Sequence, residues 1–487
     1  MYFKNYDNTI HFEIMVRVAK AFHSEDFEAA VDRIPQEMRP RSQKSSRCCI
    51  YRDRAIIKYR CMATLGFAIE NEDNELKPLS AYAHEALNRE RLSGNMITFI
   101  DEACNGCVRT HYEATSACRG CLAEACVQHC PKDAVQVVNG KSVIDPDKCI
   151  KCGKCMDACP YHAIVYIPIP CEESCPTGAI SKDVSGKEVI DYGKCIFCGK
   201  CMAACPFTAV LERSQMIDVM QGLKKKQSMV AMIAPAIAGE FNASMKQLAT
   251  ALRRIGFADV VEVAAGADIT ARLEANEFIE RMEHGAPFMT TSCCPAYTEL
   301  VRKHIPELGP FVSDTRTPMH YTAQMVKEQD DNSCTVFVGP CVAKRHEGTN
   351  DELVDYVLTF QELEAMFQAQ GVVISECEES EFGIAGCREG RSFPVSGGVT
   401  AGIRSMINER AEILQPTIVD GLNSKSLKEL KKFVKQGAPG NFVEVMGCEG
   451  GCVAGPATIV PARKATKKCT DYASSSPSAL CAERAAD

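Results

Sequence analysis

The sequence lacks the segments that would send a chain into or across a membrane. Its longest apolar stretch, residues 229–239, contains Pro235 and falls well short of the roughly 20 residues that a membrane-spanning helix needs. The first residues, MYFKNYDNTIHFEIMV, do not follow the basic, apolar and small-residue order of a secretory signal. We therefore expect a cytoplasmic protein without a membrane span.

Long basic runs are also missing. The 55 Lys and Arg residues are outnumbered by 63 Asp and Glu residues, which gives no support to nucleic-acid binding. Cysteine, in contrast, is abundant, with 29 in 487 residues. A chain of this length does not need disulfides to fold, and a reducing compartment disfavours them. The cysteines therefore indicate metal or redox chemistry.

The distribution of the cysteines divides the chain into four parts. Residues 1–100 hold three cysteines and are expected to form a mainly helical N-terminal domain of unknown role. The basic run at residues 41–60 in this part is interpreted either as a solvated face or as a docking surface for a partner. Residues 101–221 are rich in cysteine, and residues 222–463 alternate strand-like and helical patterns, which is typical of an α/β fold. The Ser- and Ala-rich residues 464–487 are predicted to be a flexible tail.

Two segments of the cysteine-rich part, residues 149–160 and 195–206, follow the pattern C-x2-C-x2-C-x3-C-P. In this ferredoxin pattern three thiolates bind one 4Fe-4S cluster, and the cysteine before proline binds the neighbouring cluster. A related segment with two extra residues covers 118–131. The predicted ligand sets are Cys118, Cys121, Cys126 and Cys159 for the first cluster, Cys130, Cys149, Cys152 and Cys155 for the second, and Cys175, Cys195, Cys198 and Cys201 for the third.

Four cysteines of this part remain, namely Cys104, Cys107, Cys171 and Cys205. They can hold a fourth 4Fe-4S cluster if the loop of the first two folds back. A structural zinc site and unligated thiols are the alternatives. Clusters within one small domain form a path for electrons.

Three further motifs follow strand-like runs in the α/β part: TSCCPAY at 291–297, VGPCVAKRHE at 338–347 and VEVMGCEGGCVAGP at 443–456. Strand ends and helix starts are where α/β folds build ligand sites. The motif set closely resembles the three H-cluster signatures of iron-only (FeFe) hydrogenases, in the right order and after a ferredoxin-like region. This resemblance implies a two-lobed α/β H-cluster domain, with parallel sheets flanked by helices, preceded by ferredoxin-like α+β iron-sulfur domains.

The resemblance also implies an H-cluster, in which a 4Fe-4S cubane is bridged to a diiron subsite that carries CO, cyanide and a dithiolate. Cys293 would be the thiol that donates protons, and Lys344 would hydrogen-bond a cyanide ligand. Ala234 and Pro235 would line the subsite, while Phe393 and Met446 would exclude water. The cubane ligands would be Cys294, Cys341, Cys448 and the bridging Cys452.

The family also conducts protons along carboxylates and hydroxyls. Glu274, Glu277 and Arg281 have the i, i+3, i+7 spacing that places side chains along one side of a helix. On residue pattern alone, this stretch could be an ordinary solvated helix face. With Cys293 in place, the resemblance favours a relay in which Ser313 lies between the two glutamates.

Several positions depart from the usual family pattern. Ala296 and Tyr297 stand where Gly-Trp is common, and the chain has no tryptophan. Gly339 replaces the usual methionine before Pro-Cys, and the third motif continues without its usual glycine-rich segment. The pattern is similar to the branch called group B. The departures leave the predicted ligands unchanged but bear on rate, direction and oxygen sensitivity.

The expected activity is reversible formation of H2 from two protons and two electrons, with ferredoxin or a similar soluble carrier as electron partner. Dedicated maturation enzymes would have to build the diiron subsite. Two alternatives remain open. One is an iron-sulfur assembly-type protein without a diiron site, although such proteins are expected to lack Cys293 and Lys344. The other is a hydrogen sensor.

Overall fold

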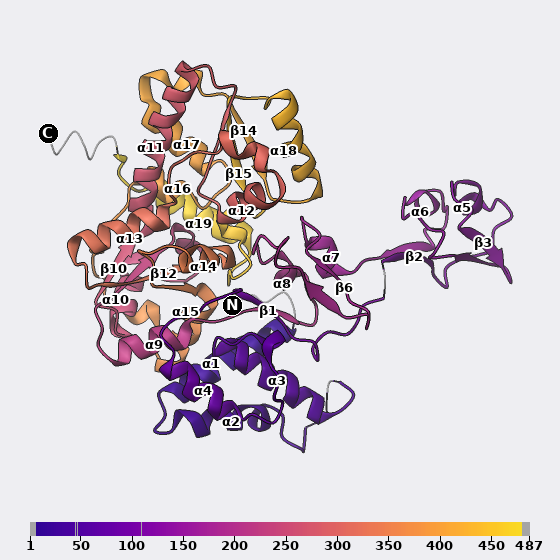
Figure 1. Ribbon diagram of the computed structural model, residues 1–487, viewed down its shortest axis with the longest axis horizontal. Helices are drawn as coiled ribbons and strands as arrows, with labels where there is room; N and C mark the ends of the chain where they lie inside the picture. The colour runs from indigo at the N-terminus through magenta and orange to yellow at the C-terminus, as the bar shows by residue number, and fades with distance from the viewer. Residues whose placement is uncertain (1–5, 44, 46, 109, 480–487) are drawn as a thin grey trace.

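The computed structural model describes residues 6–43, 45, 47–108 and 110–479. The N-terminal part is helical and lies at the bottom of Figure 1. Asp26 caps the second helix by accepting a hydrogen bond from the Ala29 N–H. The helices are α1 (Tyr6–Phe22), α2 (Phe27–Met38), α3 (Ile50–Thr64), the 3-10 turn η1 (Ile69–Asn71) and α4 (Leu79–Asn88).

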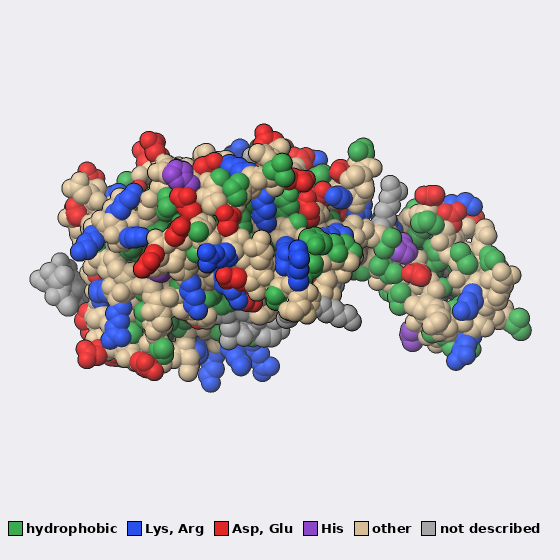
Figure 2. All heavy atoms as spheres, turned by 90° about the horizontal axis from the view of Figure 1, so that it is seen from below, with side chains coloured by type: hydrophobic (Ala, Val, Ile, Leu, Met, Phe, Trp, Pro, Cys, Tyr) green, Lys and Arg blue, Asp and Glu red, His purple; other side chains and the backbone are tan. Residues whose placement is uncertain are grey.

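The cysteine-rich part forms two small units. The outer unit projects as a separate lobe at the right of Figures 1 and 2. It contains the antiparallel pairs β2 (His111–Ala114) with β5 (Ile164–Ile167) and β3 (Val135–Val138) with β4 (Lys141–Ile144), and the short helices α5 (Ala125–Gln128) and α6 (Lys154–Asp157). The inner unit contains α7 (Pro170–Ser174), β6 (Ile180–Lys182) paired with β7 (Glu188–Ile190), α8 (Lys200–Ala204), and β1 (Ile97–Phe99) paired with β8 (Val210–Glu212).

The α/β part has two parallel sheets, as the sequence predicts. The first, in the order β10-β9-β12-β13, contains β9 (Met229–Ile233), β10 (Asp259–Glu262), β12 (Cys334–Gly339) and β13 (Tyr356–Thr359). Strand β9 is buried along its whole length, which matches its continuous apolar run. The second sheet, in the order β11-β15-β14, contains β11 (Met289–Thr290), β14 (Pro416–Asp420) and β15 (Phe442–Met446).

Helices flank both sheets and give the two-lobed α/β fold. Helix α9 (Met216–Lys224) runs across the domain boundary that the sequence suggested after residue 221. The other helices and 3-10 turns of this part are η2 (Pro235–Gly239), α10 (Met245–Arg254), α11 (Val263–Glu283), α12 (Pro295–His304), η3 (Pro306–Phe311), α13 (Pro318–Gln329), α14 (Val342–Thr349), α15 (Phe360–Gln370), η4 (Ile374–Glu376), α16 (Arg388–Ser392), α17 (Gly398–Ile407), η5 (Asn408–Ile413), α18 (Ser424–Gln436), η6 (Cys452–Ala454) and α19 (Ala462–Ser474).

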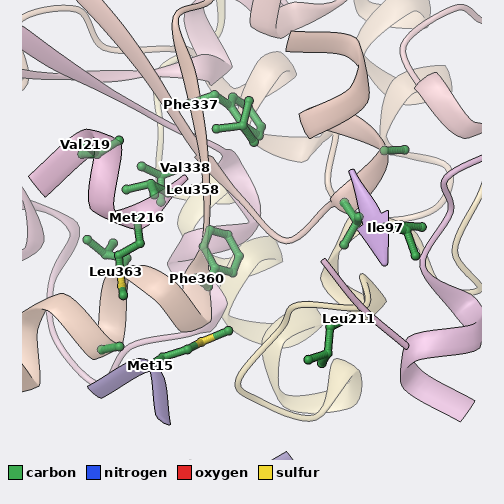
Figure 3. Packing of buried hydrophobic residues seen from close by; sticks show 14 of the residues in the cluster. Met15, Ile97, Leu211, Met216, Val219, Phe337, Val338, Leu358, Phe360 and Leu363 are labelled. Carbon is green, nitrogen blue, oxygen red and sulfur yellow. The ribbon is translucent and has the colours of Figure 1, made fainter. Parts of the chain in front are cut away.

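One hydrophobic core runs from the N-terminal helices into the first parallel sheet. Met15 of α1 belongs to the same cluster as Phe360 and Leu363 of α15, and Figure 3 shows these side chains close together. The N-terminal helices are therefore packed against the α/β part through buried apolar surface.

The predicted flexible tail is wrong for residues 464–479. Helix α19 buries Ala465, Cys469 and Ala473, which are four residues apart and so form one apolar stripe. The Tyr472 hydroxyl donates a hydrogen bond to Glu262 at 2.8 Å. Residues 480–487, with Cys481, lie outside the described residues.

Two further observations concern the whole described chain. None of its helices, within residues 6–479 and outside the few positions not described, is long and apolar enough to cross a membrane. Every described cysteine is a free thiol.

Candidate functional site

A cavity lies where the ends of the parallel strands meet the starts of two helices. Cys294 precedes the first residue of α12, and Cys341 precedes the first residue of α14. Both thiols line the cavity together with Cys448 and Cys452, the four cysteines that the resemblance implies as ligands of one cluster. The cavity has a volume of about 100 Å³, whereas about 10–15 Å³ is enough for one water molecule.

The electrostatics of these four thiols favour a cationic occupant. Burial raises the pKa of Cys341 to about 12, and Cys294 beside it adds to this shift. Burial and the thiols of Cys341 and Cys294 also raise the pKa of Cys452 to about 12. Cys452 is an exposed residue that also lines the cavity. Four crowded thiolates need a positive centre between them, which an iron-sulfur cluster supplies.

The other predicted cavity residues lie in the same place. Ala234, Pro235, Phe393 and Met446 form apolar walls of this cavity. Lys344 also lines it, and its Nζ lies 2.8 Å from Glu347 Oε2. Burial lowers the pKa of Lys344, but the Glu347 carboxylate outweighs burial, so the pKa is raised and the side chain stays charged.

Cys293 lines the cavity beside the ligand-type Cys294. Burial raises its pKa well above the usual value, and the nearby Glu274 carboxyl adds to this effect. The thiol is therefore neutral near pH 7. A neutral thiol can donate a proton to a group inside the cavity and then regain one from Glu274.

Helix α11 aligns the predicted proton path. Glu274 is completely buried, and burial raises its pKa to about 7. The Ser313 hydroxyl donates to Glu277 Oε2 at 2.5 Å and also lies close enough to Glu274 to lower its pKa slightly. Glu277 in turn pairs with Arg281 at 2.6 Å. All five predicted members of the path, including Cys293, are thus neighbours in one chain of polar groups.

The outer end of this chain reaches solvent. Arg281 also pairs at 3.0 Å with Asp314, whose side chain is 95% exposed. One member of the chain was missed from the sequence, namely Ser292. Its N–H donates to Glu274 Oε1 at 3.1 Å, and its Oγ lies 3.1 Å from the same oxygen. In the sequence, the position of Ser292 directly before Cys293 could have identified it as a member of the proton path.

The outer lobe contains two cavities, and each is lined by four thiols. These are the two ligand sets that the crossover rule predicts. Among the described residues, no group of three or more His, Cys, Asp or Glu side chains is arranged to hold a single metal ion. The first cavity is lined by Cys118, Cys121, Cys126 and Cys159, and the second by Cys130, Cys149, Cys152 and Cys155.

The inner unit brings together the third and fourth sets. Cys201 is surrounded by Cys198, Cys195 and Cys175, whose charges raise its pKa further after burial. The fourth set also converges. The thiols of Cys104 and Cys205 lie close enough to Cys107 to raise its pKa, and those of Cys205 and Cys107 raise the pKa of Cys171. The loop of Cys104 and Cys107 therefore does fold back onto the other two.

Comparisons with known proteins agree with this geometry. Residues 227–456 match the family model described as the iron only hydrogenase large subunit, C-terminal domain. A 4Fe-4S binding domain matches residues 142–165, and an LdpA Fe-S cluster-binding domain matches residues 165–216. Iron hydrogenase 1 from Clostridium pasteurianum is 32% identical over 385 residues, which cover 67% of this chain and 66% of that protein.

The chain belongs to the iron-only hydrogenase family. The large subunit of the periplasmic [Fe] hydrogenase from Nitratidesulfovibrio vulgaris is 28% identical over 43% of this chain and 61% of that protein. A probable cytosolic Fe-S cluster assembly factor from Drosophila virilis is 27% identical over 44% of this chain and 57% of that protein. The chain thus spans about two thirds or less of each relative.

Two backbone features recur in all four thiol sets of this hydrogenase-family chain. Each leading cysteine is followed two residues later by a residue with φ near +57°, and each cysteine before proline accepts an N–H···S hydrogen bond from an alanine four residues on. The fourth set has both features, so it is built like the other three. The positive-φ residues are Gly106, Gly120, Lys151 and Phe197, and the donors are Ala134, Ala163, Ala179 and Ala209, at 3.3, 3.4, 3.2 and 3.5 Å from sulfur.

The third set adjoins the hydrogenase-type cavity. Cys198 lines that cavity, and it is close enough to Cys448 to raise the pKa of that thiol. Lys303 of α12 donates to the carbonyl oxygen of Cys195 at 2.6 Å, which ties the inner unit to the α/β part. The two thiol sets are therefore held in fixed proximity.

The departures from the family pattern are accommodated by packing. The Tyr297 hydroxyl is buried and lies 2.7 Å from Thr290 Oγ1, so its polar atom has a partner. At Gly339 a Cβ would lie 2.4 Å from the Phe337 ring and 3.3 Å from the Ala234 Cβ. A larger side chain there would displace the wall that carries Ala234.

Proposed function

We propose that this protein catalyses the reversible reaction of two protons and two electrons to H2 at an H-cluster. The observation that carries the proposal is the convergence of Cys294, Cys341, Cys448 and Cys452 on one cavity that Cys293 and Lys344 also line. The cofactor would supply a redox-active diiron centre at which electrons and protons combine. Lys344 would donate hydrogen bonds to an anionic ligand of that centre.

The protein residues would bring the protons. Cys293 would exchange a proton with the centre and regain it from Glu274, whose pKa near 7 suits both gain and loss of a proton at neutral pH. Ser313 would pass the proton between Glu274 and Glu277, since a hydroxyl can accept one hydrogen bond and donate another. Arg281 would hold Glu277 in place. Phe393 and Met446 would keep bulk water from the cavity.

Electrons would arrive through 4Fe-4S clusters bound by the four thiol sets. The outer lobe would receive them from ferredoxin or a similar soluble carrier, and exposed Leu122 and Ile150 beside its ligands give a carrier apolar contact surface. The third set, next to the cavity, would deliver them to the H-cluster. The diiron subsite would come from dedicated maturation enzymes.

An assembly-type protein without a diiron site is the second candidate, and the similarity to the Drosophila virilis protein favours it. Cys293 and Lys344 argue against it, because assembly-type proteins are expected to lack both residues and both line the cavity here. The decisive experiment is infrared spectroscopy of the full chain after anaerobic maturation, together with an H2 assay using a reduced dye. CO and cyanide bands with H2 turnover are expected. A protein that carries its full iron content but shows no such bands after maturation would be the assembly-type protein.

A further inference from the structure

Cys452, the bridging ligand that the resemblance implies, lies in a loop with little rigidity of its own. The two residues before it, Gly450 and Gly451, both have positive φ, at +89° and +93°. Because glycine restricts the backbone less than any other residue, contacts from outside have to fix the position of this loop. A thiolate that joins two metal centres needs such a fixed position.

Segment 394–396 supplies two of these contacts. The Ser396 N–H donates to Gly450 O at 3.2 Å. The Val453 N–H donates to Pro394 O, also at 3.2 Å. Because Gly450 precedes and Val453 follows the bridging cysteine, the segment holds this loop from both ends.

The backbones of the segment and the loop are in direct contact. At Gly451 a Cβ would lie 2.5 Å from Pro394 O and 2.7 Å from Ser396 N, so no larger residue fits there without a shift of the backbone. A movement of segment 394–396 would therefore also move the loop of Cys452.

Glu444 holds the segment in turn. This side chain is fully buried on β15, the middle strand of the second sheet (Figure 1). Its Oε1 accepts the Gly397 N–H at 2.7 Å. Its Oε2 accepts the Thr400 N–H at 2.8 Å and the Thr400 hydroxyl at 2.7 Å. These groups lie at the N-terminus of α17, where a carboxylate is stabilised by N–H groups that have no partner within the helix.

The same strand leads to a second ligand of the cavity. Strand β15 ends at Met446, which lines the cavity, and Cys448 follows two residues later. The chain itself therefore fixes Cys448 to β15, whereas Cys452 is connected to this strand through Glu444, α17 and segment 394–396. The Glu444 carboxyl is also close enough to Cys452 to raise the pKa of that thiol.

We propose that Glu444 is a positioning residue, which holds Cys452 and the Phe393 wall in place relative to Cys448 through segment 394–396. The inference rests on the proposed H-cluster, in which Cys452 is the bridging ligand. Phe393 directly precedes the segment, so the same contacts also fix this apolar wall.

Other contacts limit the effect that loss of Glu444 would have. Backbone hydrogen bonds join segment 394–396 to the ends of α16 and α17. In addition, Asp420 Oδ1 of β14 accepts the Gly450 N–H at 2.8 Å. Loss of the Glu444 contacts should therefore loosen the loop of the bridging cysteine without releasing it.

The test is amide hydrogen exchange of the full chain, kept anaerobic, in Glu444→Gln, Thr400→Val and the control Ser244→Ala. Glu444→Gln keeps the volume of the side chain but replaces one acceptor oxygen by an amide donor. We expect the amides of Gly397, Thr400 and Val453 to exchange about tenfold faster in this variant, because hydrogen bonds to a charged group are lost. The infrared bands of CO and cyanide in the matured variant should broaden, since the bridging thiolate would occupy a range of positions.

The two other variants separate positioning from general loss of stability. Ser244 caps α10, a helix of ten residues like α17, by accepting the Gln247 N–H at 3.1 Å. Ser244→Ala should speed exchange in α10 but leave Val453 and the infrared bands unchanged within twofold. Thr400→Val removes only the hydroxyl contact and should give a smaller change of the same pattern as Glu444→Gln. If Glu444→Gln does not fold, Thr400→Val decides.

Exchange at Val453 within twofold of the parent protein would overturn the inference, because Glu444 would then not act on the loop of the bridging cysteine. Equally faster exchange in every helix would also overturn it, since this indicates general destabilisation. Absence of CO and cyanide bands in the matured parent protein would instead refute the hydrogenase proposal. Faster exchange at both Gly397 and Val453 in such a protein would still support the positioning role, for whichever cluster the four cysteines bind.

Discussion

Replacing Glu274 by Gln tests the proton path at its most buried member. The substitution keeps the shape of the side chain, and an amide oxygen can still accept the Ser292 N–H at 3.1 Å. It removes the carboxyl that accepts the hydrogen bonds of Ser292, and a step of general acid-base catalysis typically contributes about 10²–10⁴-fold in rate. We expect H2 evolution and uptake to fall at least a hundredfold, equivalent to about 2.7 kcal/mol of barrier.

The same substitution has the opposite effect on stability. Burial raises the pKa of Glu274 from 4.5 to about 7, and a shift of that size corresponds to about 3 kcal/mol. Because the folded state holds the proton more tightly than the unfolded state, this group's contribution to stability is fully present below pH 4.5 and is lost as the pH rises through 7. The Gln variant should therefore match the parent protein at pH 4.5 and gain up to about 3 kcal/mol above pH 8.

The assay combines H2 evolution from reduced dye between pH 5 and 9 with anaerobic denaturant unfolding at the same pH values. Glu280→Gln, on the exposed side of the same helix, is the matched control. The infrared bands should persist in both variants. A Glu274→Gln protein with activity within twofold of the control at every pH would refute the relay through this carboxyl.

Other predictions follow from single contacts. Cys293→Ala should abolish H2 turnover while the CO and cyanide bands remain, whereas surviving turnover would exclude this thiol as the proton donor. Gly239→Ala should destabilise the fold by about 1–3 kcal/mol in thermal unfolding, since its Cβ would lie 2.6 Å from the Ala465 Cβ of α19, and an unchanged midpoint would contradict the packing. Cys152→Ser should lower ferredoxin-driven turnover far more than dye-driven turnover, because its set lies in the outer lobe, and equal losses would argue against electron entry there.

The sequence is most informative where ligands lie close together in the chain or follow the repeated cysteine spacing of ferredoxins. The sets of the outer lobe follow from spacing, because a C-x2-C-x2-C turn fixes three thiols and the cysteine before proline belongs to the neighbouring site. The alignment of Glu274 and Glu277 on one side of a helix likewise follows from their i, i+3 spacing. Sequence could not show which buried carboxyl would gain a pKa near 7, since that depends on complete burial by elements far apart in the chain.

Two predictions based on local composition are wrong, because composition does not show which distant residues a segment packs against. The Ser- and Ala-rich composition after residue 464 predicts disorder, but the small side chain of Ala465 lets α19 lie closely against Gly239 of η2. The basic run suggested a solvated face because charge is usually exposed. Arg60 is instead buried, and its Nη2 donates to the carbonyl oxygens of Phe207 and Thr208, next to Cys205. Such partners lie more than a hundred residues away and leave no local signal.

The arrangement of the cavity separates the routes of the two reactants. Protons would reach it through Cys293, at the end of β11, from the polar chain that begins at Glu274 on α11. Electrons would reach it through Cys198 and Cys448, on the side that faces the inner iron-sulfur unit. Phe393 and Met446 form apolar walls of the same cavity. In the proposed relay, the buried Glu274, whose pKa is raised to about 7, would be the group through which pH controls the reaction.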